Sequence, residues 1–389
     1  MTDYYEKSVQ VHALLHGKME IASKVPLETR DDMSVAYTPG VSRPCQEIFA
    51  HPERAYDLTI KRNTVAVVTD GSSVLGLGNI GPLAALPVME GKAILFKEYA
   101  GIDAWPICLD TQDPDEVVET VRRIAPGFGG VNLEDIAAPH CFEIEGRLQD
   151  LGIPVFHDDQ HGTAAVVLAG LRNACRVVGR ELKDLSVVIV GAGAAGIAIA
   201  RLLYGVGVSD AAFVKDLLLC DSKGIVHRGR SDLNAIKRQT LDFTNLHDRS
   251  GSLHDAMEGA DAFIGVSHGN LLVAGDIRRM NKDPIIFALA NPEPEIMPDA
   301  ARAGGAAVIA TGRSDFPNQV NNVLIFPGIF RGALDARAAR ITPRMIYNAA
   351  IALSDCSKNP TADEILPSPL DRAVAPYVGR VVKRSALND

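Results

Sequence analysis

The sequence is poor in cysteine and aromatic residues, and it has no long uncharged apolar run. Its six cysteines include no pair at metal-ligand or redox-motif spacing, so we expect reduced thiols. A membrane-spanning helix needs roughly 18 apolar residues. The apolar run at residues 164–171 is too short and ends at Arg172. The N-terminal MTDYYEKSVQ has no apolar signal-peptide core, so we expect a cytoplasmic protein.

Positively charged residues are also fewer than negatively charged ones. The 389 residues contain 39 Lys and Arg against 48 Asp and Glu, which gives a net charge of -9 without a long basic run. This balance disfavours nucleic acid and anionic membranes as partners. The 47% hydrophobic and 22% charged content is typical of a globular protein. The chain is too long for one ordinary core, and we expect two domains, at residues 1–159 and 160–389.

Alternating strand and helix patterns dominate the second region. After a long apolar helical stretch at residues 162–178, these patterns occupy residues 185–190, 194–203, 217–220, 262–266, 285–289 and 307–310. Such alternation predicts an α/β fold with a doubly wound, Rossmann-type parallel sheet. C-terminal helices are expected at residues 342–354 and 370–382.

The first region mixes helices with strands, which also predicts an α/β domain. Residues 64–69 and 93–96 have the apolar character of buried strands. Residues 115–124 carry helical apolar spacing, and Pro114 suits the start of that helix.

A glycine-rich turn joins the predicted strand at residues 185–190 to the next helix. Its sequence is Gly191-Ala192-Gly193-Ala194-Ala195-Gly196. Glycines permit a tight turn, and the helix N-terminus presents free N–H groups to a pyrophosphate. The next strand ends at Asp221, where a carboxylate suits ribose hydroxyls. Together these features favour a dinucleotide site over a ligand-free glycine turn.

A second glycine pattern, Gly76-Leu77-Gly78-Asn79-Ile80-Gly81, also follows a strand and precedes a helix. Residues 70–75 separate the strand from the glycines, so the loop is not the tight turn that a pyrophosphate site requires. Its N–H groups better suit a nest that faces another part of the cofactor or the substrate.

Two acidic pairs, Glu134-Asp135 and Asp158-Asp159, end apolar segments just before the dinucleotide unit. Carboxylate oxygens suit a hard divalent cation, Mg²⁺ or Mn²⁺. A solvated loop or helix cap explains either pair taken singly, but two pairs at apolar strand ends favour a metal. His157 and His161 lie nearby, yet no third His or Cys has the spacing of a zinc site.

Ordered motifs along essentially the whole chain resemble those of the malic enzymes, in their short bacterial form. The motifs that carry this resemblance are AYTPG at residues 36–40, VTDGSSVLGLGNIG at 68–81, MEGK at 89–92, NLED at 132–135, FHDDQHGT at 156–163, LANP at 289–292 and NQVNN at 318–322. The resemblance implies a malic domain, a dinucleotide-binding domain, NAD or NADP, and Mg²⁺ or Mn²⁺.

The resemblance also implies roles for particular residues. Tyr37 would act as the acid and Lys92 as the base, with Asp158 a partner in proton movement. The implied metal ligands are Glu134, Asp135 and Asp159, and the implied malate-binding residues are Asn291 and Asn322. The implied cofactor contacts are Val74, Leu75, Gly76, Leu77, Gly78, Asn79, Ile80, Gly81, Gly191, Ala192, Gly193, Ala194, Ala195, Gly196, Asp221, Lys223 and Asn291.

The implied reaction is the oxidative decarboxylation of (S)-malate to pyruvate and carbon dioxide. Lys92 would take the alcohol proton as hydride leaves for the nicotinamide, and the metal would stabilise the enolate formed on decarboxylation. Tyr37 would then protonate the enol carbon. Burial and the metal lower the pKa of a lysine, whereas a nearby Asp158 raises it. Without the resemblance, Tyr37 and Asn291 would be ordinary turn residues and Lys92 a surface lysine.

Several alternatives stay open. A malolactic enzyme would use the same residues to release lactate, and a non-catalytic dinucleotide sensor is disfavoured by the intact Tyr37, Lys92 and metal carboxylates. Longer malic enzymes place a substrate-binding arginine where this chain has Ser72-Ser73, so the cation opposite the distal carboxylate of malate is not identified. The sequence also leaves the choice between Mg²⁺ and Mn²⁺ and any allosteric effectors open. A homodimer is the family expectation.

Cofactor choice depends on the end of the strand at residues 217–220. Asp221 favours the free 2′-hydroxyl of NAD, whereas Lys223 is placed to offset the repulsion of a 2′-phosphate. One surface charge pair is worth only about 1 kcal/mol, so we expect both cofactors to work.

Overall fold

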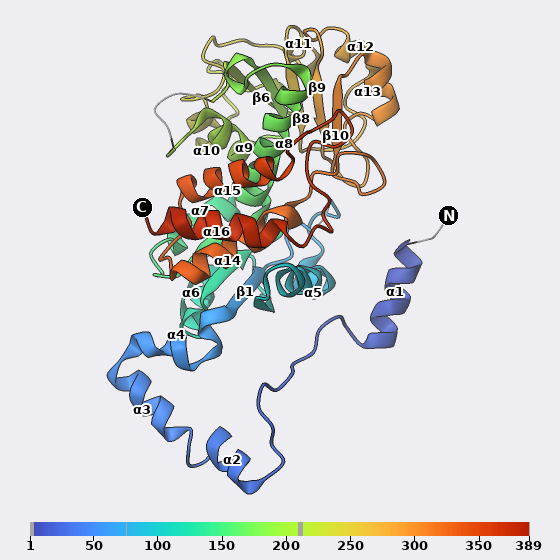
Figure 1. The fold of residues 1–389 in the computed structure, drawn as a ribbon. Coiled ribbons are helices and arrows are strands. Elements are labelled where there is room, and N and C mark those ends of the chain that lie inside the picture. Colours follow the sequence, from blue (N-terminus) through green and yellow to red (C-terminus); the bar gives the residue numbers. More distant parts are fainter. Residues whose placement is uncertain (1–3, 75, 209–212, 389) are drawn as a thin grey trace.

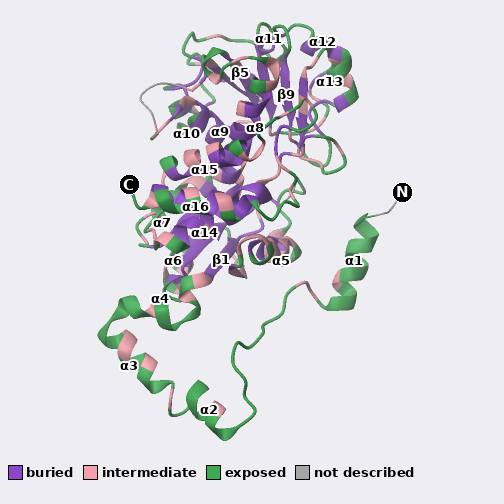
Figure 2. Cartoon of the chain, viewed as in Figure 1, coloured by how far each residue is buried: buried purple, intermediate pink, exposed green. Residues whose placement is uncertain are grey.

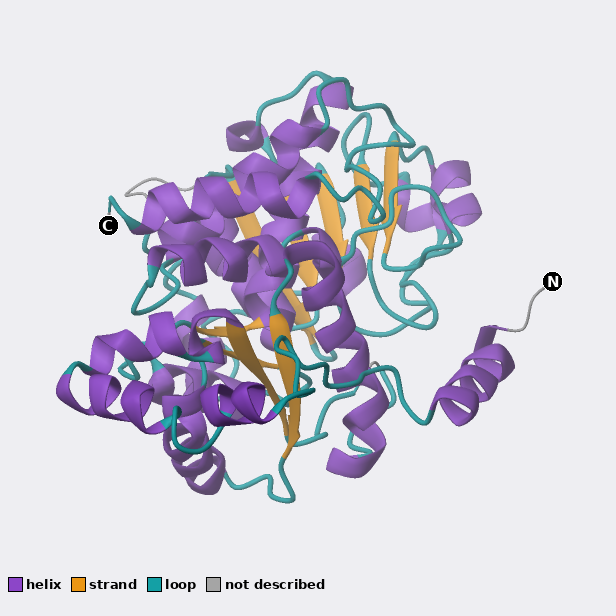
Figure 3. Cartoon of the chain, turned by 60° about the horizontal axis from the view of Figure 1, so that its bottom comes forward, coloured by secondary structure: helices purple, strands orange, loops and turns teal. Residues whose placement is uncertain are grey.

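Two largely parallel sheets organise the described part of the chain, which comprises residues 4–74, 76–208 and 213–388 of a computed structural model (Figures 1 and 3). Leu75, one of the expected cofactor contacts, lies outside these residues. The α/β class predicted from the sequence is confirmed. Among the described helices, none combines the length and apolar character needed to cross a bilayer.

The first sheet has four parallel strands in the order β2-β1-β3-β4. The strands are β1 (Thr64–Thr69), β2 (Asp103–Cys108), β3 (Gly130–Leu133) and β4 (Val155–His157). Apolar residues of α5 (Gly81–Ala100) cover one face, and those of α6 (Pro114–Ile124) and α7 (His140–Leu148) cover the other. Since both faces are covered, every residue of β1, β3 and β4 is buried.

The carboxyl ends of three neighbouring strands carry acidic residues. Asp70 follows β1, Glu134 follows β3 and Asp158 follows β4. Parallel strands end at the same edge of a sheet, so the fold brings these side chains together although they are far apart in the sequence.

The second sheet has the order β10-β9-β8-β5-β6-β7, in which only the short β7 is antiparallel. Its strands are β5 (Ser186–Val190), β6 (Asp216–Asp221), β7 (Gly224–Ile225), β8 (Ala262–Gly265), β9 (Ile285–Ala288) and β10 (Val308–Thr311). The helices around it are α9 (Ala194–Tyr204), α10 (Ala235–Thr240), α11 (Leu253–Ala256), α12 (Ala274–Ile277) and α13 (Pro298–Gly304). The strand order reverses between β5 and β8, which is where α/β sheets bind ligands.

Helices join the two sheets into one body. The mostly buried α8 (Thr163–Val178) runs from the end of the first sheet towards the second. The C-terminal helices are α14 (Phe326–Ala336), α15 (Pro343–Cys356) and α16 (Val374–Ala386). In α14, Phe326 and Phe330 make edge contacts with Phe96 of α5, with ring centroids 4.8 and 5.2 Å apart. The end of the chain therefore packs on the first sheet.

The N-terminal segment extends away from this body (Figures 1 and 2). It carries α1 (Tyr4–Leu15), α2 (Arg30–Ala36) and α3 (Ser42–Ala50), none of which has a buried residue, and the short α4 (Ala55–Leu58) leads back to β1. We call residues 4–50 the N-terminal arm. Its apolar side chains that are more than half exposed are Tyr4, Tyr5, Val9, Leu14, Leu15, Ile21, Val25, Leu27, Met33, Val35, Tyr37 and Phe49. These apolar side chains are therefore exposed to solvent in the described part of a single chain.

Most predicted elements are confirmed, but the strand expected at residues 93–96 is wrong. These residues belong to α5, whose buried residues Ala85, Met89, Lys92, Ala93 and Phe96 recur at helical spacing. A short apolar run does not distinguish a buried strand from one face of a helix.

Candidate active site

Lys92 lies at the centre of the acidic edge of the first sheet. It projects from α5, is only 9% exposed, and donates from Nζ to Asp158 Oδ2 at 2.6 Å. Its Nζ also lies 2.8 Å from Glu134 Oε1. Burial works against the charge of Lys92, but Asp158 and Glu134 outweigh that effect and raise the pKa of the lysine above its ordinary value.

Asp158 and Asp159 start a single π-helical turn, residues 158–162, between β4 and α8. Such turns are frequent at functional sites. A Cβ at Gly162 would lie 1.9 Å from Asp158 Oδ1, so only glycine lets the Asp158 carboxylate fold back over the turn. Asp158 thereby faces Lys92, whereas Asp159 Oδ2 accepts from the backbone N–H of Asp135 at 2.9 Å.

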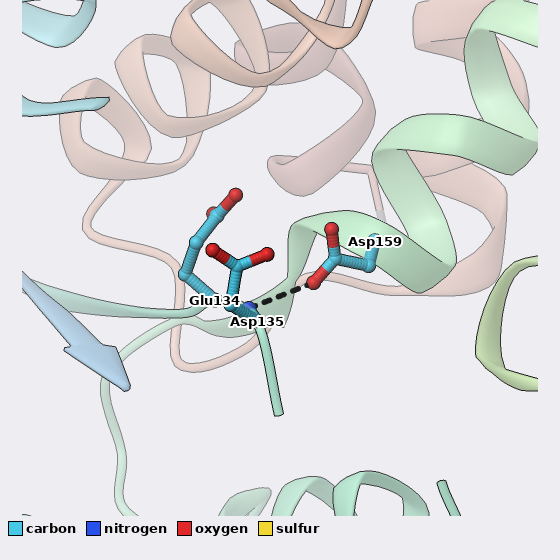
Figure 4. Close-up of side chains that lie close together, drawn as sticks. All are labelled: Glu134, Asp135 and Asp159. Carbon is cyan, nitrogen blue, oxygen red and sulfur yellow. Dashed lines mark hydrogen bonds between the residues drawn. The ribbon is translucent and has the colours of Figure 1, made fainter. Parts of the chain in front are cut away.

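The three expected metal ligands come together. Carboxylate oxygens of Glu134, Asp135 and Asp159, one from each residue, lie within 4.8 Å of one another (Figure 4). Burial raises the pKa of Glu134 well above its ordinary value. The opposing charge of Lys92 lowers it, and the charges of Asp159, Asp158 and Asp135 add to the rise. Three converging carboxylates with one lysine carry excess negative charge. The donor set, all oxygen, therefore fits a hard divalent cation.

Ser72 and Ser73 link the loop that carries Glu134 and Asp135 to the loop that follows β1. Ser72 Oγ donates to Asp70 at 2.6 Å and accepts from Ala137 N at 2.8 Å, and Ser73 N donates to Asp135 O at 2.9 Å. The serine pair thus links the two loops.

The dinucleotide loop has the geometry that its glycines predict. Gly191 has a φ of 109°, and a Cβ there would lie 2.6 Å from Val266 O, just after β8. A Cβ at Gly196 would lie 1.9 Å from Gly191 O, so α9 can start only because this position is glycine. The loop lies where the strand order reverses, and the N–H groups of α9 are available for a pyrophosphate.

The second glycine loop meets the dinucleotide-binding domain. Gly76 has a φ of 75°, and a Cβ there would lie 2.5 Å from Asn291 O. The loop therefore packs on the backbone of Asn291, a residue expected to contact both malate and cofactor. Asn322 joins the site more directly, because its Nδ2 donates to Asp158 Oδ2 at 3.0 Å.

Asp221 is occupied by the chain itself. Its Oδ1 accepts from Arg230 and from the backbone N–H of Lys223, and its Oδ2 accepts from Arg230 and Lys237, all at 2.6–3.0 Å. Burial opposes the charge, but these donors hold the pKa of Asp221 at about 2. Lys223 Nζ pairs with Asp232 at 2.9 Å. A carboxylate has about four acceptor positions, and all four are filled here.

Tyr37 is the expected site residue that the fold leaves outside. It follows α2 in the N-terminal arm and is 70% exposed. Figure 1 shows α2 far from α5, the helix that carries Lys92. Sequence motifs identify residue types and order, but they do not show that this one lies on a projecting arm.

Sequence patterns did not predict that Glu145, in α7, belongs to the site. It is buried and forms hydrogen bonds with His157, Gln160 and His161, in and next to the turn at residues 158–162. Its helical neighbours Glu143 and Arg147 form an ordinary exposed ion pair, so the local pattern resembles a solvated helix face.

The parallel sheets, the glycine loop at the strand-order reversal and the acidic cluster define a two-domain, dinucleotide-binding α/β enzyme with a candidate metal centre. Residues 16–149 match the family model for the malic enzyme N-terminal domain, and residues 160–383 match that for the malic enzyme NAD-binding domain. The chain therefore belongs to the malic enzyme family, and the predicted nicotinamide-dependent oxidoreductase is confirmed.

Individual relatives agree with this assignment. The chain is 53% identical to the bifunctional malic/malolactic enzyme of Bacillus subtilis over 98% of this chain and 93% of that protein. It is 46% identical to the NADP-dependent malic enzyme of Halomonas elongata over 99% of this chain and 92% of that protein. The crystal structure of an NAD-dependent malic enzyme from Thermotoga maritima aligns with a TM-score of 0.92 and 46% identity, covering 98% of this chain and 99% of that one.

Proposed function

We propose that this protein oxidises malate with NAD or NADP and decarboxylates the product to pyruvate, with help from a divalent cation. The observation that carries the proposal is the position of Lys92. Its ammonium lies between Asp158, at 2.6 Å, and Glu134, at 2.8 Å. Lys92, which would transfer protons, is thus adjacent to the carboxylate cluster that would hold the metal and, with it, the substrate.

Glu134, Asp135 and Asp159 would hold the cation. When bound, Mg²⁺ or Mn²⁺ supplies a Lewis acid that polarises the keto group and stabilises negative charge during decarboxylation. Asn132 supports this site, because its Nδ2 donates to Glu134 Oε2 at 2.7 Å and leaves Oε1 towards Lys92.

Lys92 handles the alcohol proton of malate. It must be neutral to accept that proton, yet its raised pKa keeps it charged in this geometry. Asp158 lies 2.6 Å away and is placed to take the ammonium proton first. Asn322 donates to the same Asp158 oxygen, and its amide is therefore next to the reacting groups. Asn322 and Asn291 would bind malate beside these groups.

The glycine loop at residues 191–196 holds the cofactor. NAD or NADP, when bound, accepts the hydride of malate. Gly76 of the second glycine loop packs against the backbone of Asn291, and this contact supports a role for that loop beside the cofactor.

The 2′-phosphate of NADP would be bound by a positive cluster around Asp221. Arg230, Lys237 and Lys223 exceed the charges of Asp221 and Asp232 by one, and Asp221 has no acceptor position left for a ribose hydroxyl. This arrangement accommodates a 2′-phosphate better than a bare carboxylate would. Both cofactors are therefore accepted, with the phosphate contact made by the lysines rather than opposed by Asp221.

Tyr37 supplies the proton to the enol from a second copy of the chain. In one chain it is 70% exposed on an arm whose apolar side chains lack cover. A homodimer in which each arm lies on the other copy would bury that apolar surface and bring Tyr37 to the partner's Lys92. The expected homodimer and the expected acid then have a single structural explanation.

Malolactic turnover is the second candidate, because the Bacillus subtilis relative is named a bifunctional malic/malolactic enzyme. The deciding experiment is an initial-rate assay with malate, Mn²⁺ and each cofactor in turn. Pyruvate formed in step with reduced cofactor supports the proposal. Lactate without net reduced cofactor would assign malolactic activity, and no turnover with either cofactor would leave a dinucleotide-binding protein without this activity.

A further inference from the structure

Glu145 of α7 binds three donors, two in the turn at residues 158–162 and one on His157 just before it. Its Oε1 accepts from the backbone N–H of His157 at 3.1 Å, and its Oε2 accepts from Gln160 Nε2 at 3.1 Å. His161 Nε2 lies 2.9 Å from Oε1 and 3.0 Å from Oε2. Glu145 itself is 8% exposed. A buried carboxylate is costly unless it is hydrogen-bonded, so this one is committed to the turn.

The position of Glu145 in the chain gives this contact its meaning. The helix α7 follows the loop of Glu134 and Asp135, and the turn carries Asp158 and Asp159. One link is direct, since Asp135 N donates to Asp159 Oδ2 at 2.9 Å. Glu145 makes a second link through α7. The two chain segments that supply the candidate metal ligands are therefore connected twice.

The turn also borders a cavity. This cavity, of about 400 Å³, is lined by Glu145, Gln160 and His161 together with residues of α9, α10 and α15. Side chains lack close contacts where they border a cavity, so the hydrogen bonds of Glu145 add to the packing of the turn on that side.

We propose that Glu145 is a positioning residue that sets the spacing between the Glu134–Asp135 loop and Asp159, and thereby the affinity for the divalent cation. The proposal rests on the metal site assigned under the proposed function. Glu145 touches neither substrate nor metal and acts through the turn. Its carboxylate accepts from all three donors at once, which a neutral side chain of the same shape cannot do.

The test compares Glu145→Gln with the matched control Glu143→Gln on the same helix. Glu143 is 54% exposed and pairs with Arg147, away from the turn. Mn²⁺ affinity is measured by calorimetric titration without malate or cofactor, alongside thermal unfolding and the kcat and KM for malate. Glutamine keeps the size of the side chain, so no new cavity forms. Its NH₂ group, however, takes the place of an oxygen that accepts hydrogen bonds and cannot accept from the donors that face that position.

Glu145→Gln should raise the Kd for Mn²⁺ by about tenfold or more, as is usual when an outer partner of metal ligands is lost. Saturating Mn²⁺ should then restore most of kcat, whereas Glu143→Gln should match the wild type throughout. An unchanged Mn²⁺ affinity in folded Glu145→Gln, or an equal loss in the control, would overturn the proposal.

A second variant keeps the test decisive if Glu145→Gln does not fold. Gln160→Leu removes one of the three donors and should raise the Kd several-fold in the same direction. Equal affinity in this variant and the wild type would overturn the positioning role. Wild-type protein that binds no Mn²⁺ would overturn both this role and the metal site. Wild-type protein that binds Mn²⁺ but does not turn over malate would contradict the proposed activity alone.

Discussion

Lys92 Nζ donates to Asp158 Oδ2 across 2.6 Å, which joins α5 to the turn that follows β4. The same nitrogen lies 2.8 Å from Glu134, a candidate metal ligand. Lys92 is thus shared between an acid outside the metal cluster and one inside it. A cation bound at Glu134 would compete with the lysine for that carboxylate, so metal binding and the charge of Lys92 are coupled.

The first prediction concerns the effect of Asp158 on the pKa of Lys92. Asp158 raises the pKa of Lys92, so Asp158→Asn should lower it. If neutral Lys92 is the base, activity rises as pH rises through that pKa. The acid limb of kcat/KM for malate should therefore move to lower pH, by roughly one to three units for the loss of an adjacent opposite charge. The rate at the plateau should also fall, because Asp158 no longer accepts the lysine proton.

The exposed Asp150, which pairs with Arg122, provides the control. Asp150→Asn should leave the pH profile unchanged. An acid limb that stays in place in Asp158→Asn would mean that Lys92 does not set the profile.

The sequence predicts the parts of this site that follow strand ends. Glu134 and Asp158 come directly after apolar segments, and parallel strands bring such positions to one edge. The loop at residues 191–196 is predictable for the same reason, since a glycine turn between strand and helix has few geometries. These inferences depend only on local patterns and on a general rule of sheet topology.

Other features depend on contacts that no local pattern encodes. Arg230 and Lys237 fill the acceptor positions of Asp221 from a loop and a separate helix, so the sequence suggested a free carboxylate. Glu145 resembles a surface residue until the turn at residues 158–162 is seen beside it. The exposure of Tyr37 follows from the position of α2, none of whose side chains is buried by the described residues of its own chain.

A second prediction tests the metal directly. Asp159 would be a ligand, so Asp159→Ala should abolish malate turnover and lower Mn²⁺ affinity by more than the roughly 10–100-fold typical of an outer-shell change. Excess Mn²⁺ should recover little activity, in contrast to Glu145→Gln. Titration calorimetry and rate assays on the same preparations make this comparison. Full activity of chelator-treated wild-type enzyme would remove the metal from the mechanism.

A third prediction concerns the 2′-phosphate of NADP. Lys223 is 65% exposed and pairs with Asp232, so it is free to turn towards a phosphate at small cost. Lys223→Ala and Lys237→Ala should each raise the KM for NADP several-fold, since one such charge pair is worth about 1 kcal/mol. The KM for NAD should stay nearly flat. Initial rates with both cofactors measure the two constants.

Lys183 is a matched control for general charge. It is similarly exposed and pairs with Glu181 before β5 begins. Lys183→Ala should change neither constant. A parallel rise for NAD and NADP in the Lys223 variant would show that this lysine acts on the fold or on overall charge, and that the phosphate is bound elsewhere.

A fourth prediction separates the roles of Tyr37 and Lys92. Tyr37→Phe should lose pyruvate formation from malate but still reduce added oxaloacetate with reduced cofactor, because the redox step does not need the enol proton. Lys92→Ala should lose both activities. Equal loss of oxaloacetate reduction in the two variants would contradict this division.

The last prediction concerns which copy of the chain supplies Tyr37. It is tested by mixing Tyr37→Phe with Lys92→Ala, neither of which should form pyruvate from malate by itself. In a mixed dimer of Tyr37→Phe and Lys92→Ala, an arm that reaches the partner's site pairs wild-type Lys92 of one copy with wild-type Tyr37 of the other. One of the two sites is then intact. Random reassociation of equal amounts makes about half of the dimers mixed. Pyruvate formation from malate should therefore recover to about a quarter of the wild-type rate. If Tyr37 served its own chain, every site would lack one residue, and the mixture would stay as inactive as its components. Size-exclusion chromatography confirms that dimers re-form, so that absence of recovery counts against exchange of the arms.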